Sequence, residues 1–440
     1  MAAKRRQKRE TRTPADGAAR RLPLAVVILA AGEGKRMKSA LPKVLQPLAG
    51  RPLLKHVIDT ARSLAPRALH VVYGHGGERV RTALADEAVT WTLQPERLGT
   101  GHAVQLAMPQ IPDDHRVLVL CGDVPLLSAA TLERLLALAG DRGVSILTAR
   151  FADPTGYGRI VRDRRGLVKR IVEEKDATPA QRRIAECNTG VLAAPARRLR
   201  GWLASLGTGN SQGEYYLTDV VALAVRDRVA VHAIEARPAH EALGVNDKVQ
   251  LAALERIARE RAAQALLEGG VTLADPARVD VRGTVVHGSD VSIDVNVVLE
   301  GAHIGARCNI GPFARMRPAV ELSDEVHIGN FVEVKNSRLG VASKANHLAY
   351  VGDARVGTRV NLGAGTIVAN YDGAVKNASA IGDDVHTGSN TVLVAPITVG
   401  AGATIAAGST VTHSVPPGGL TIARARQTTL PKWRRPRKGG

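Results

Sequence analysis

The sequence predicts an α/β domain followed by an all-β domain: an N-terminal Rossmann-like domain, a linker helix, and a C-terminal left-handed parallel β-helix of hexapeptide repeats. Three observations predict this order. Apolar, strand-like runs alternate with helical stretches in the first half of the chain. A long segment rich in Ala, Leu, Glu and Arg follows, and aliphatic residues then recur at every sixth position almost to the end.

Length and composition are those of a soluble globular protein. The 440 residues suffice for two or three domains, and with only 3% aromatic residues the cores must be aliphatic. The three cysteines, Cys121, Cys187 and Cys308, form no CxxC pair, which argues against a disulfide framework or a thiolate zinc site. No apolar run is long enough to cross a bilayer, and no signal-peptide pattern is present. We therefore expect a cytoplasmic protein without membrane insertion.

Two tails hold much of the formal net charge of +19. Residues 1–22 carry eight Lys and Arg against two acidic residues, and residues 432–438 add five more basic residues. We expect residues 1–22 and 428–440 to be disordered basic tails. Nucleic-acid binding is the alternative. Outside the tails no basic motif is interleaved with aromatic residues, so we expect no specific nucleic-acid partner, and the mildly basic remainder suits anionic small molecules.

The predicted α/β domain spans residues 23–246. Residues 24–31 form a continuous apolar run, which is typical of a buried parallel strand. Further strands are expected at 68–73 and 117–121, and helices at 53–64 and 128–139. This alternation predicts βαβ units and a doubly wound sheet.

A linker helix and a β-helix are predicted next, at residues 247–268 and 269–427. Asn246 or Asp247 can cap the helix, and Gly269-Gly270 ends it. The six-residue repeat runs through Val298, Ile304, Ile310, Met316, Leu322, Ile328 and Val334, then Val356, Leu362 and Val368, then Ile381, Thr387, Leu393, Val399, Ile405 and Val411. The period breaks at 336–350 and 370–380, which we expect to be loops that leave the β-helix, where function often resides.

A glycine-rich turn follows the first predicted strand. Gly32 and Gly34 allow a tight turn whose N–H groups can hold phosphate, and Lys35, Arg36 and Lys43 add positive charge. Met37 stands where a dinucleotide-binding GxGxxG motif needs its third glycine, and no P-loop motif is present.

Residues 29–37 (LAAGEGKRM) and 41–45 (LPKVL) resemble the sugar-1-phosphate nucleotidyltransferases. The resemblance becomes more specific with three further features: Gln94, the segment 98–103 (LGTGHA) and the segment 122–126 (GDVPL). Together with the hexapeptide repeats, the chain resembles the bifunctional N-acetylglucosamine-1-phosphate uridylyltransferases/glucosamine-1-phosphate acetyltransferases over residues 22–438. The resemblance implies an N-terminal nucleotidyltransferase domain that transfers uridylyl from UTP and releases pyrophosphate, mainly by positioning and charge neutralisation.

Asp123 is expected at the carboxyl end of a buried strand, where α/β sheets bind ligands and where a carboxylate can hold Mg²⁺. A turn cap is the alternative. By the resemblance, Asp123 and Asn246 hold Mg²⁺, and Lys43 and Arg36 bind and polarise the triphosphate. The nucleotide and sugar would contact Leu29, Ala30, Ala31, Gly32, Lys43, Gln94, Gly99, Thr100, Gly158, Glu173, Asn188 and Asn246.

His347 lies in the first predicted break and has the chemistry of a general base for acetyl transfer to an amine. A lone histidine is more often structural. By the resemblance, His347 is the catalytic base and Glu333 orients it. Glucosamine 1-phosphate would contact Arg317, Lys335, Tyr350, Asn361 and Lys376, and acetyl-CoA would contact Ala364, Asn370, Tyr371, Ser389, Ala407 and Arg424. The resemblance also implies a homotrimer with acetyl-transfer sites between subunits.

The sequence departs from the family pattern at three places. Cys121 stands where we expect Tyr, which leaves the fine sugar preference open, and Asn346 stands where we expect Gly. About two coils of the β-helix are missing between Gly301 and Ala302, which preserves the hexapeptide register.

Two other enzyme classes remain as alternatives. One is a nucleotidyltransferase for another sugar 1-phosphate, with a β-helix used only for assembly. The other is a zinc hydrolyase on the same β-helix, for which His303, His327, His347 and His386 could supply ligands.

Overall fold

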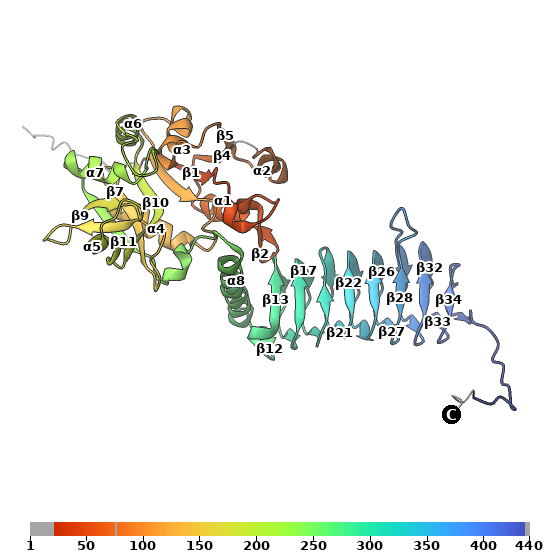
Figure 1. Cartoon of the computed structure of the whole chain (residues 1–440). Helices are drawn as coiled ribbons and strands as arrows, with labels where there is room; N and C mark the ends of the chain where they lie inside the picture. The colour runs from red at the N-terminus through yellow and green to blue at the C-terminus, as the bar shows by residue number, and fades with distance from the viewer. Residues whose placement is uncertain (1–21, 75–76, 436–440) are drawn as a thin grey trace, which may run out of the picture. The chain divides into compact units, whose positions relative to one another are not determined.

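The computed structural model describes residues 22–74 and 77–435 (Figure 1). The chain forms two compact units. Unit 1 holds the described residues up to Leu45 together with Leu53–Asn246, and unit 2 holds Gln46–Pro52 and the described chain from Asp247 onward. The expected N-terminal tail, except residue 22, and residues 436–440 lie outside the described residues. Residues 428–435 are exposed.

Unit 1 is built on a mixed sheet with the strand order β11-β7-β10-β6-β1-β4-β5. Its strands are β1 (Leu24–Ala30), β4 (Ala68–Gly74), β5 (Thr90–Gln94), β6 (Arg116–Cys121), β7 (Val144–Arg150), β10 (Glu186–Pro195) and β11 (Val231–Glu235), with β8 (Arg159–Arg162) and β9 (Val168–Val172) at the side. The other neighbours in this order pair in parallel, whereas β10 runs antiparallel to β6 and β7. The predicted α/β fold is confirmed, and the reversed β10 is an addition to it.

Two apolar cores lie on the two faces of this sheet, because successive side chains of a strand point to opposite faces. Ala25 and Val27 of β1 belong to one core, and Val26 and Ile28 to the other. The helices are α1 (Leu53–Ser63), α2 (Glu78–Ala83), α3 (Thr100–Ala107), α4 (Ala129–Ala139), α5 (Pro179–Arg182), α6 (Ala196–Ala204) and α7 (Asp219–Arg226), with 3-10 turns at Met108–Gln110 and Ala239–Ala242. Helices α3, α6 and α7 cover the first core, and α1 and α4 cover the second.

Helix α8 (Lys248–Glu268) belongs to unit 2. The Asp247 side chain caps it by accepting a hydrogen bond of 2.8 Å from the backbone N–H of Gln250. A short hairpin of β2 (Pro47–Leu48) and β3 (Arg51–Pro52) belongs to this unit. The hairpin is held to α8 because Glu255 accepts a 2.8 Å hydrogen bond from the N–H of Ala49.

The rest of unit 2 is a left-handed β-helix with three parallel faces (Figure 1). The first face contains β12 (Thr272–Leu273), β15 (Ser292–Ile293), β18 (Asn309–Ile310), β21 (His327–Asn330), β24 (Lys344–His347), β27 (Asn361–Leu362), β30 (His386–Thr387), β33 (Thr404–Ile405) and β35 (Leu420–Thr421). The second contains β13 (Val279–Arg282), β16 (Val297–Glu300), β19 (Arg315–Met316), β22 (Glu333–Lys335), β25 (Tyr350–Gly352), β28 (Ile367–Ala369), β31 (Val392–Val394) and β34 (Thr410–Val411). The third contains β14 (Val286–His287), β17 (Ala302–Ile304), β20 (Val320–Leu322), β23 (Ser337–Leu339), β26 (Ala354–Val356), β29 (Ser379–Ile381) and β32 (Ile397–Val399).

A single apolar core fills this prism, as the hexapeptide pattern predicts. The prediction that residues 336–350 leave the β-helix is wrong, since they form β23 and β24. The step from buried Val334 to buried Leu339 is five residues instead of six, so the coil is shortened without a loop. Val298 was also misplaced, because it points outward while Val297 and Leu299 are buried. The chain does leave the β-helix between β28 and β29, where Tyr371 and Lys376 pair.

Within the described residues, every helix is too short or too polar to cross a membrane.

Candidate active sites

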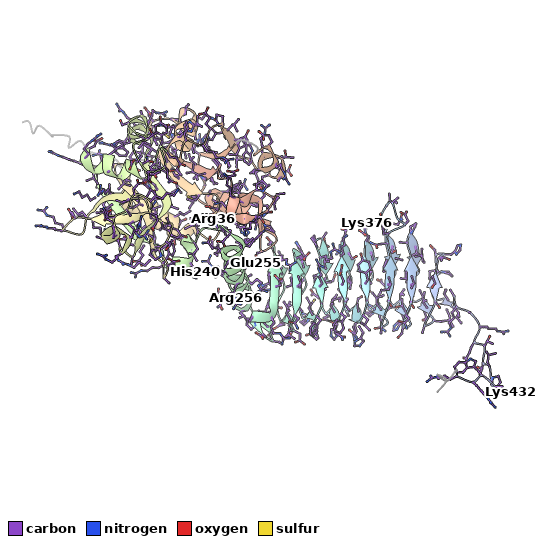
Figure 2. The ribbon with its side chains drawn as sticks, viewed as in Figure 1. Arg36, His240, Glu255, Arg256, Lys376 and Lys432 are labelled. Carbon is purple, nitrogen blue, oxygen red and sulfur yellow. The ribbon has the colours of Figure 1, made fainter. Side chains whose placement is uncertain are left out.

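The first candidate site is a pocket of about 300 Å³ at the carboxyl ends of β1, β5 and β6. Its lining contains nine of the predicted residues: Leu29, Ala30, Ala31, Gly32, Lys43, Gln94, Gly99, Thr100 and Asp123. These residues lie far apart in the sequence and meet because the carboxyl ends of parallel strands share one edge of the sheet. Arg36 is exposed and does not line the pocket (Figure 2).

The glycine-rich turn brings Lys43 to the pocket. Gly34 has φ +67°, in the left-handed region that favours glycine, and a Cβ there would lie 2.6 Å from the Cβ of Lys43. The two short helices Lys35–Met37 and Lys43–Leu45 can therefore pack closely on either side. Met37, which replaces a motif glycine, is buried in the apolar interior.

Lys43 and Asp123, which line this pocket, form a polar cluster with Asn246. The ammonium group of Lys43 makes a short ion pair with Asp123 and lies 3.4 Å from the Oδ1 atom of Asn246. The Asp123 carboxylate and the amide oxygen of Asn246 therefore both contact the ammonium group of Lys43. Oxygen donors of this kind suit Mg²⁺, which usually takes few protein ligands and completes its shell with water and phosphate. The residues therefore fit the metal that the sequence predicts.

The segment after β5 is fixed by hydrogen bonds. Gln94 is buried, and its side-chain amide donates a 3.1 Å hydrogen bond to the carbonyl of Gly99. The same amide nitrogen lies 3.1 Å from Nδ1 of His102. Gly99 has φ +108°, and a Cβ there would lie 2.6 Å from the carbonyl oxygen of Tyr215. Thr100 accepts a 3.1 Å hydrogen bond from the N–H of Leu217. A rigid segment of this kind can read a planar base through backbone groups.

Sequence reasoning missed two charged residues of the pocket, Arg97 and Glu214. Arg97 makes a short ion pair with Glu33 of the glycine-rich turn, and Lys35 lies 3.2 Å from the same carboxylate. The hydrogen bond from Lys35, followed by that from Arg97, lowers the pKa of Glu33. Arg97 could have been predicted as a pocket residue from its position, because it lies three residues after the end of a strand of the sheet.

A second cavity, of about 130 Å³, adjoins the first and shares Leu29, Thr100 and Cys121 with it. The predicted sugar residues Glu173 and Asn188 line it, and Gly158 lies beside them, since its carbonyl accepts a 2.8 Å hydrogen bond from Asn188. Burial raises the pKa of Glu173 despite a 2.9 Å hydrogen bond from Thr218. The structure thus brings the predicted sugar residues together.

The second candidate site lies on the outer surface of unit 2, on the second face. Arg317 and Glu333 form an ion pair of 3.0 Å, and Tyr350 stands next to Glu333 on the following rung. Lys335 contacts Lys376, and this contact between two ammonium groups lowers the pKa of Lys335. Arg317, Lys335 and Lys376 thus bring three positive charges to this surface, whereas Glu333, paired with Arg317, and Asp353, which acts on Lys335, are the acidic neighbours; the balance favours a phosphate.

His347 lies at the end of β24, at the edge between the first and second faces. It is exposed, and its Nδ1 atom is 2.8 Å from Oδ1 of Asn330, its neighbour on the preceding rung. Glu333 pairs with Arg317, and within one chain the side chain of Asn330 contacts the imidazole, so the orienting role of Glu333 stays a prediction. Asn330 is in register with His347 across the first face, whereas Glu333 belongs to the second face.

Four of the predicted acetyl-CoA residues form a column along the same edge. The carbonyl of Ala364 accepts a hydrogen bond from Asn390, and the carbonyl of Ser389 accepts one from Gly408. The side chain of Arg424 donates a short hydrogen bond to the carbonyl of Ala407. Ala364, Ser389, Ala407 and Arg424 thus follow His347 on successive rungs.

The remaining predicted residues lie elsewhere on the prism. Asn361 is on the first face, between Lys344 and His386. Asn370 and Tyr371 belong to the loop before β29, together with Lys376, which Figure 2 shows on the projecting loop. One copy of the chain therefore does not bring all the predicted residues into one site.

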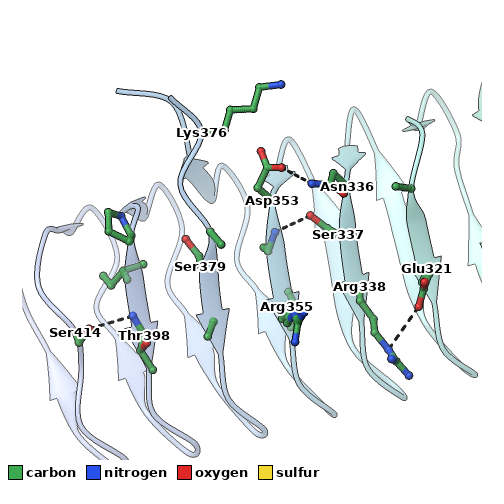
Figure 3. Close-up of a pocket in the computed structure, with 17 residues that line it drawn as sticks. Glu321, Asn336, Ser337, Arg338, Asp353, Arg355, Lys376, Ser379, Thr398 and Ser414 are labelled. Atoms are coloured by element: carbon green, nitrogen blue, oxygen red, sulfur yellow. Dashed lines mark hydrogen bonds and ion pairs between the residues drawn. The ribbon is translucent and has the colours of Figure 1, made fainter. Parts of the chain in front are cut away.

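A groove of about 930 Å³ lies on the third face (Figure 3). Glu321, Arg338 and Arg355 lie along it, and Lys376 is the only predicted site residue that lines it. This groove is therefore separate from the column that contains His347.

Two family models match different parts of the chain. Residues 26–273 match the model of the MobA-like NTP transferase domain, and residues 379–413 match that of the bacterial transferase hexapeptide repeats. The chain is 54% identical to the bifunctional protein GlmU of Azoarcus sp. (strain BH72), over 94% of this chain and 100% of the relative. It is 52% identical to the bifunctional protein GlmU of Chromobacterium violaceum, over 94% of this chain and 99% of the relative. A solved structure, a putative glucose-1-phosphate thymidylyltransferase from Bacillus anthracis, is 18% identical with a TM-score of 0.43, over 54% of this chain and 95% of that chain.

The alignment with the Azoarcus relative extends over 450 positions, although it contains only 94% of the 440 residues of this chain. About 36 positions of the alignment thus have no counterpart here, which equals two coils of about 18 residues. That these positions fall in the β-helix stays a prediction.

Proposed function

Since the chain belongs to the family of bifunctional GlmU proteins, we propose which of its residues carry each of the two reactions. The enzyme makes UDP-N-acetylglucosamine: it acetylates glucosamine 1-phosphate with acetyl-CoA and then transfers uridylyl from UTP to the product. The observation that carries this conclusion is the identity of 54% over 94% of the chain and the whole length of the relative.

In uridylyl transfer, a phosphate oxygen of N-acetylglucosamine 1-phosphate bonds to the α-phosphorus of UTP. The bond from that phosphorus to the bridging oxygen of the β-phosphate breaks, and pyrophosphate leaves. Lys43 neutralises the phosphates in the pocket, and Arg36 approaches them from the solvent side. Asp123 and Asn246 would hold Mg²⁺, and the bound ion would supply positive charge to balance that of the phosphates. Gln94, Gly99 and Thr100 hold the uracil base, and Gly158, Glu173 and Asn188 hold the sugar.

In acetyl transfer, the amine of glucosamine 1-phosphate attacks the thioester carbonyl of acetyl-CoA and forms the amide. The carbon–sulfur bond breaks, and coenzyme A leaves as its thiolate, which then takes up a proton. His347 takes the proton of the ammonium group through Nε2, because the hydrogen bond to Asn330 occupies Nδ1. Arg317, Lys335 and Lys376 bind the phosphate of the substrate. Acetyl-CoA extends along the column of Ala364, Ser389, Ala407 and Arg424.

We further propose that the enzyme is a homotrimer. Phe313, Phe331 and Leu348 stand on successive rungs beside His347, all with positive φ and about half exposed, and the two phenyl rings stack at 5.3 Å. A row of exposed apolar side chains of this kind is typical of an interface. A second copy that covers this row would also supply Asn361, Asn370 and Tyr371, which one copy leaves apart.

The substrates and the three free cysteines support a cytoplasmic enzyme.

The assignment of the two reactions to the two sites is tested in separate assays: release of free coenzyme A from acetyl-CoA with glucosamine 1-phosphate for the acetyl step, and release of pyrophosphate from UTP and Mg²⁺ with N-acetylglucosamine 1-phosphate for the uridylyl step. We expect His347→Ala to lower acetyl transfer by about 10²–10⁴-fold and to leave uridylyl transfer unchanged, and Asp123→Ala to do the reverse. His386→Ala, an exposed histidine of the first face, and Asp86→Ala, an exposed aspartate of unit 1, are the matched controls. If either site variant removes both activities from a folded protein, the proposed division is wrong.

A further inference from the structure

A buried ion pair joins the two residues that directly follow Gly158 and Glu173 in the sequence. Arg159 of β8 is 2% exposed, and its guanidinium nitrogen Nη2 lies 2.8 Å from Oε2 of Glu174. Replacing a buried pair of this kind by apolar residues is often neutral or stabilising, because both charges lose their hydration. Stability alone therefore does not account for the pair, and we looked for another role in what it holds in place.

The guanidinium of Arg159 also contacts two backbone segments. It donates a short hydrogen bond to the carbonyl of Tyr157 and a 3.3 Å hydrogen bond to the carbonyl of Arg182, the last residue of α5. Arginine suits this task because its five N–H donors are held in one rigid plane. One side chain thus ties together the loop before β8, the segment after β9 and helix α5.

The same two strand ends carry Gly158 and Glu173. Arg159 pairs with Val172 in the antiparallel register of β8 and β9, so Gly158 and Glu173 are the next residues beyond this pair. A Cβ at Gly158 would lie 3.4 Å from Oε2 of Glu173, which shows how closely the two approach. The carbonyl of Gly158 also accepts the 2.8 Å hydrogen bond from the N–H of Asn188. The relative position of the three sugar residues therefore depends on how the ends of β8 and β9 are held.

We propose that Arg159 and Glu174 are positioning residues for the sugar phosphate: their ion pair fixes the ends of β8 and β9 and so sets the distance between Gly158 and Glu173. Neither member of the pair lines the cavity of about 130 Å³, so the pair acts through its neighbours and not by contact with the substrate. Supporting contacts of this kind keep binding groups in productive geometry. The inference rests on the proposed function, because it takes Gly158 and Glu173 as residues that hold the sugar.

The test measures pyrophosphate release from UTP with N-acetylglucosamine 1-phosphate and determines the KM of each substrate separately. Glu174→Gln removes the charge of a side chain that is 27% exposed and leaves the buried guanidinium of Arg159 without its carboxylate partner. We expect the KM for the sugar phosphate to rise about tenfold and the KM for UTP to stay within about twofold, since neither residue lines the nucleotide pocket.

Two variants of Arg159 grade this effect. Arg159→Met also removes the contacts to the carbonyls of Tyr157 and Arg182, so its KM for the sugar phosphate should rise further than that of Glu174→Gln. Arg159→Lys keeps the positive charge but not the planar set of donors, and its KM should rise less than that of Arg159→Met. If Arg159→Met does not fold, Glu174→Gln and Arg159→Lys decide the question.

Arg162→Met is the matched control, because Arg162 lies on the same strand and pairs with Glu186 through hydrogen bonds of 2.8 and 2.6 Å. This pair is at the other end of β8 from Gly158, so its loss should lower the melting temperature without changing the ratio of the two KM values. The proposal is overturned by equal KM rises for both substrates, by the same selective rise in Arg162→Met, or by unchanged KM values in folded Glu174→Gln.

Glu173→Ala tests the proposed function separately. If this variant leaves the KM for N-acetylglucosamine 1-phosphate unchanged, Glu173 does not hold the sugar, and the proposed site is wrong whatever Arg159 does. If Glu173→Ala raises that KM and the variants of the ion pair do not, the sugar site stands and the positioning role fails.

Discussion

Unit 1 and unit 2 place their candidate residues in different kinds of space. In unit 1 the strand ends leave a pocket, and nine predicted residues of the nucleotide site line it within one chain. In unit 2 the interior is filled by aliphatic side chains, so the candidate residues stand on the outer surface and are divided among two faces and a loop. The filled core leaves only grooves on the surface, such as the groove of about 930 Å³ on the third face, and the acetyl-transfer site proposed above is completed by a second copy. A globular α/β unit needs none.

The largest expected difference between the two units comes from a substitution that destabilises unit 2 alone. A Cβ at Gly329 would lie 1.9 Å from the carbonyl oxygen of Asn346 on the next rung. We expect Gly329→Ala to destabilise the β-helix by about 3 kcal/mol and to abolish acetyl transfer, while uridylyl transfer persists. Both activities and a thermal melt measure this.

Gly419→Ala is the matched control for that variant, because a Cβ at Gly419 has an ordinary nearest contact of 3.4 Å with the carbonyl oxygen of Pro416. If Gly329→Ala also abolishes uridylyl transfer, the two units do not fold independently.

The next prediction tests whether acetyl transfer needs a second copy of the chain, by a substitution in the exposed apolar row of Phe313, Phe331 and Leu348. Phe331→Asp places a charge in the proposed interface, where it would lose its hydration. We expect the trimer to dissociate in sedimentation experiments and acetyl transfer to fall by about 100-fold, while uridylyl transfer stays within about twofold. Val286→Asp, at an apolar residue of the third face that is also half exposed, should change neither property. A monomer that retained full acetyl transfer would contradict the shared site.

A smaller effect is expected from the contact that holds His347. Asn330→Ala removes the partner of Nδ1 and should lower kcat for acetyl transfer by about tenfold, with little change in KM. Asn330→Asp places a carboxylate beside the ring and favours the protonated imidazole, so the acid limb of the pH profile should move to higher pH. Asn309→Asp, at an exposed residue of the same face, should not move this limb. An unmoved limb in Asn330→Asp would assign the base to another residue.

The features that could be predicted are those that depend on interactions between residues close to one another in the sequence. The apolar run of β1, the cap at Asp247 and the hexapeptide core follow from side-chain periodicity and hydrogen bonding within a few residues. The antiparallel direction of β10 and the contact between Asn330 and His347 depend on segments that meet only in the folded chain. The five-residue step after Val334 was misinterpreted as a loop because a strict six-residue period does not allow for a shortened coil.

The smallest expected effect concerns pH and the stability of unit 1. His70 of β4 is buried, neither ring nitrogen has a hydrogen-bond partner among the described residues, and burial lowers its pKa below the ordinary value of 6.5. The folded state therefore favours the neutral ring, so the unfolded state binds more protons as the pH falls below about 6.5, and stability declines in that range. His70→Leu should weaken this decline in thermal melts between pH 7 and pH 5, whereas His232→Leu on the edge strand β11 should not. Equal pH dependence in His70→Leu and the unaltered enzyme would mean that other groups cause the decline, and unit 2, whose buried core contains no histidine among its described residues, provides the internal reference.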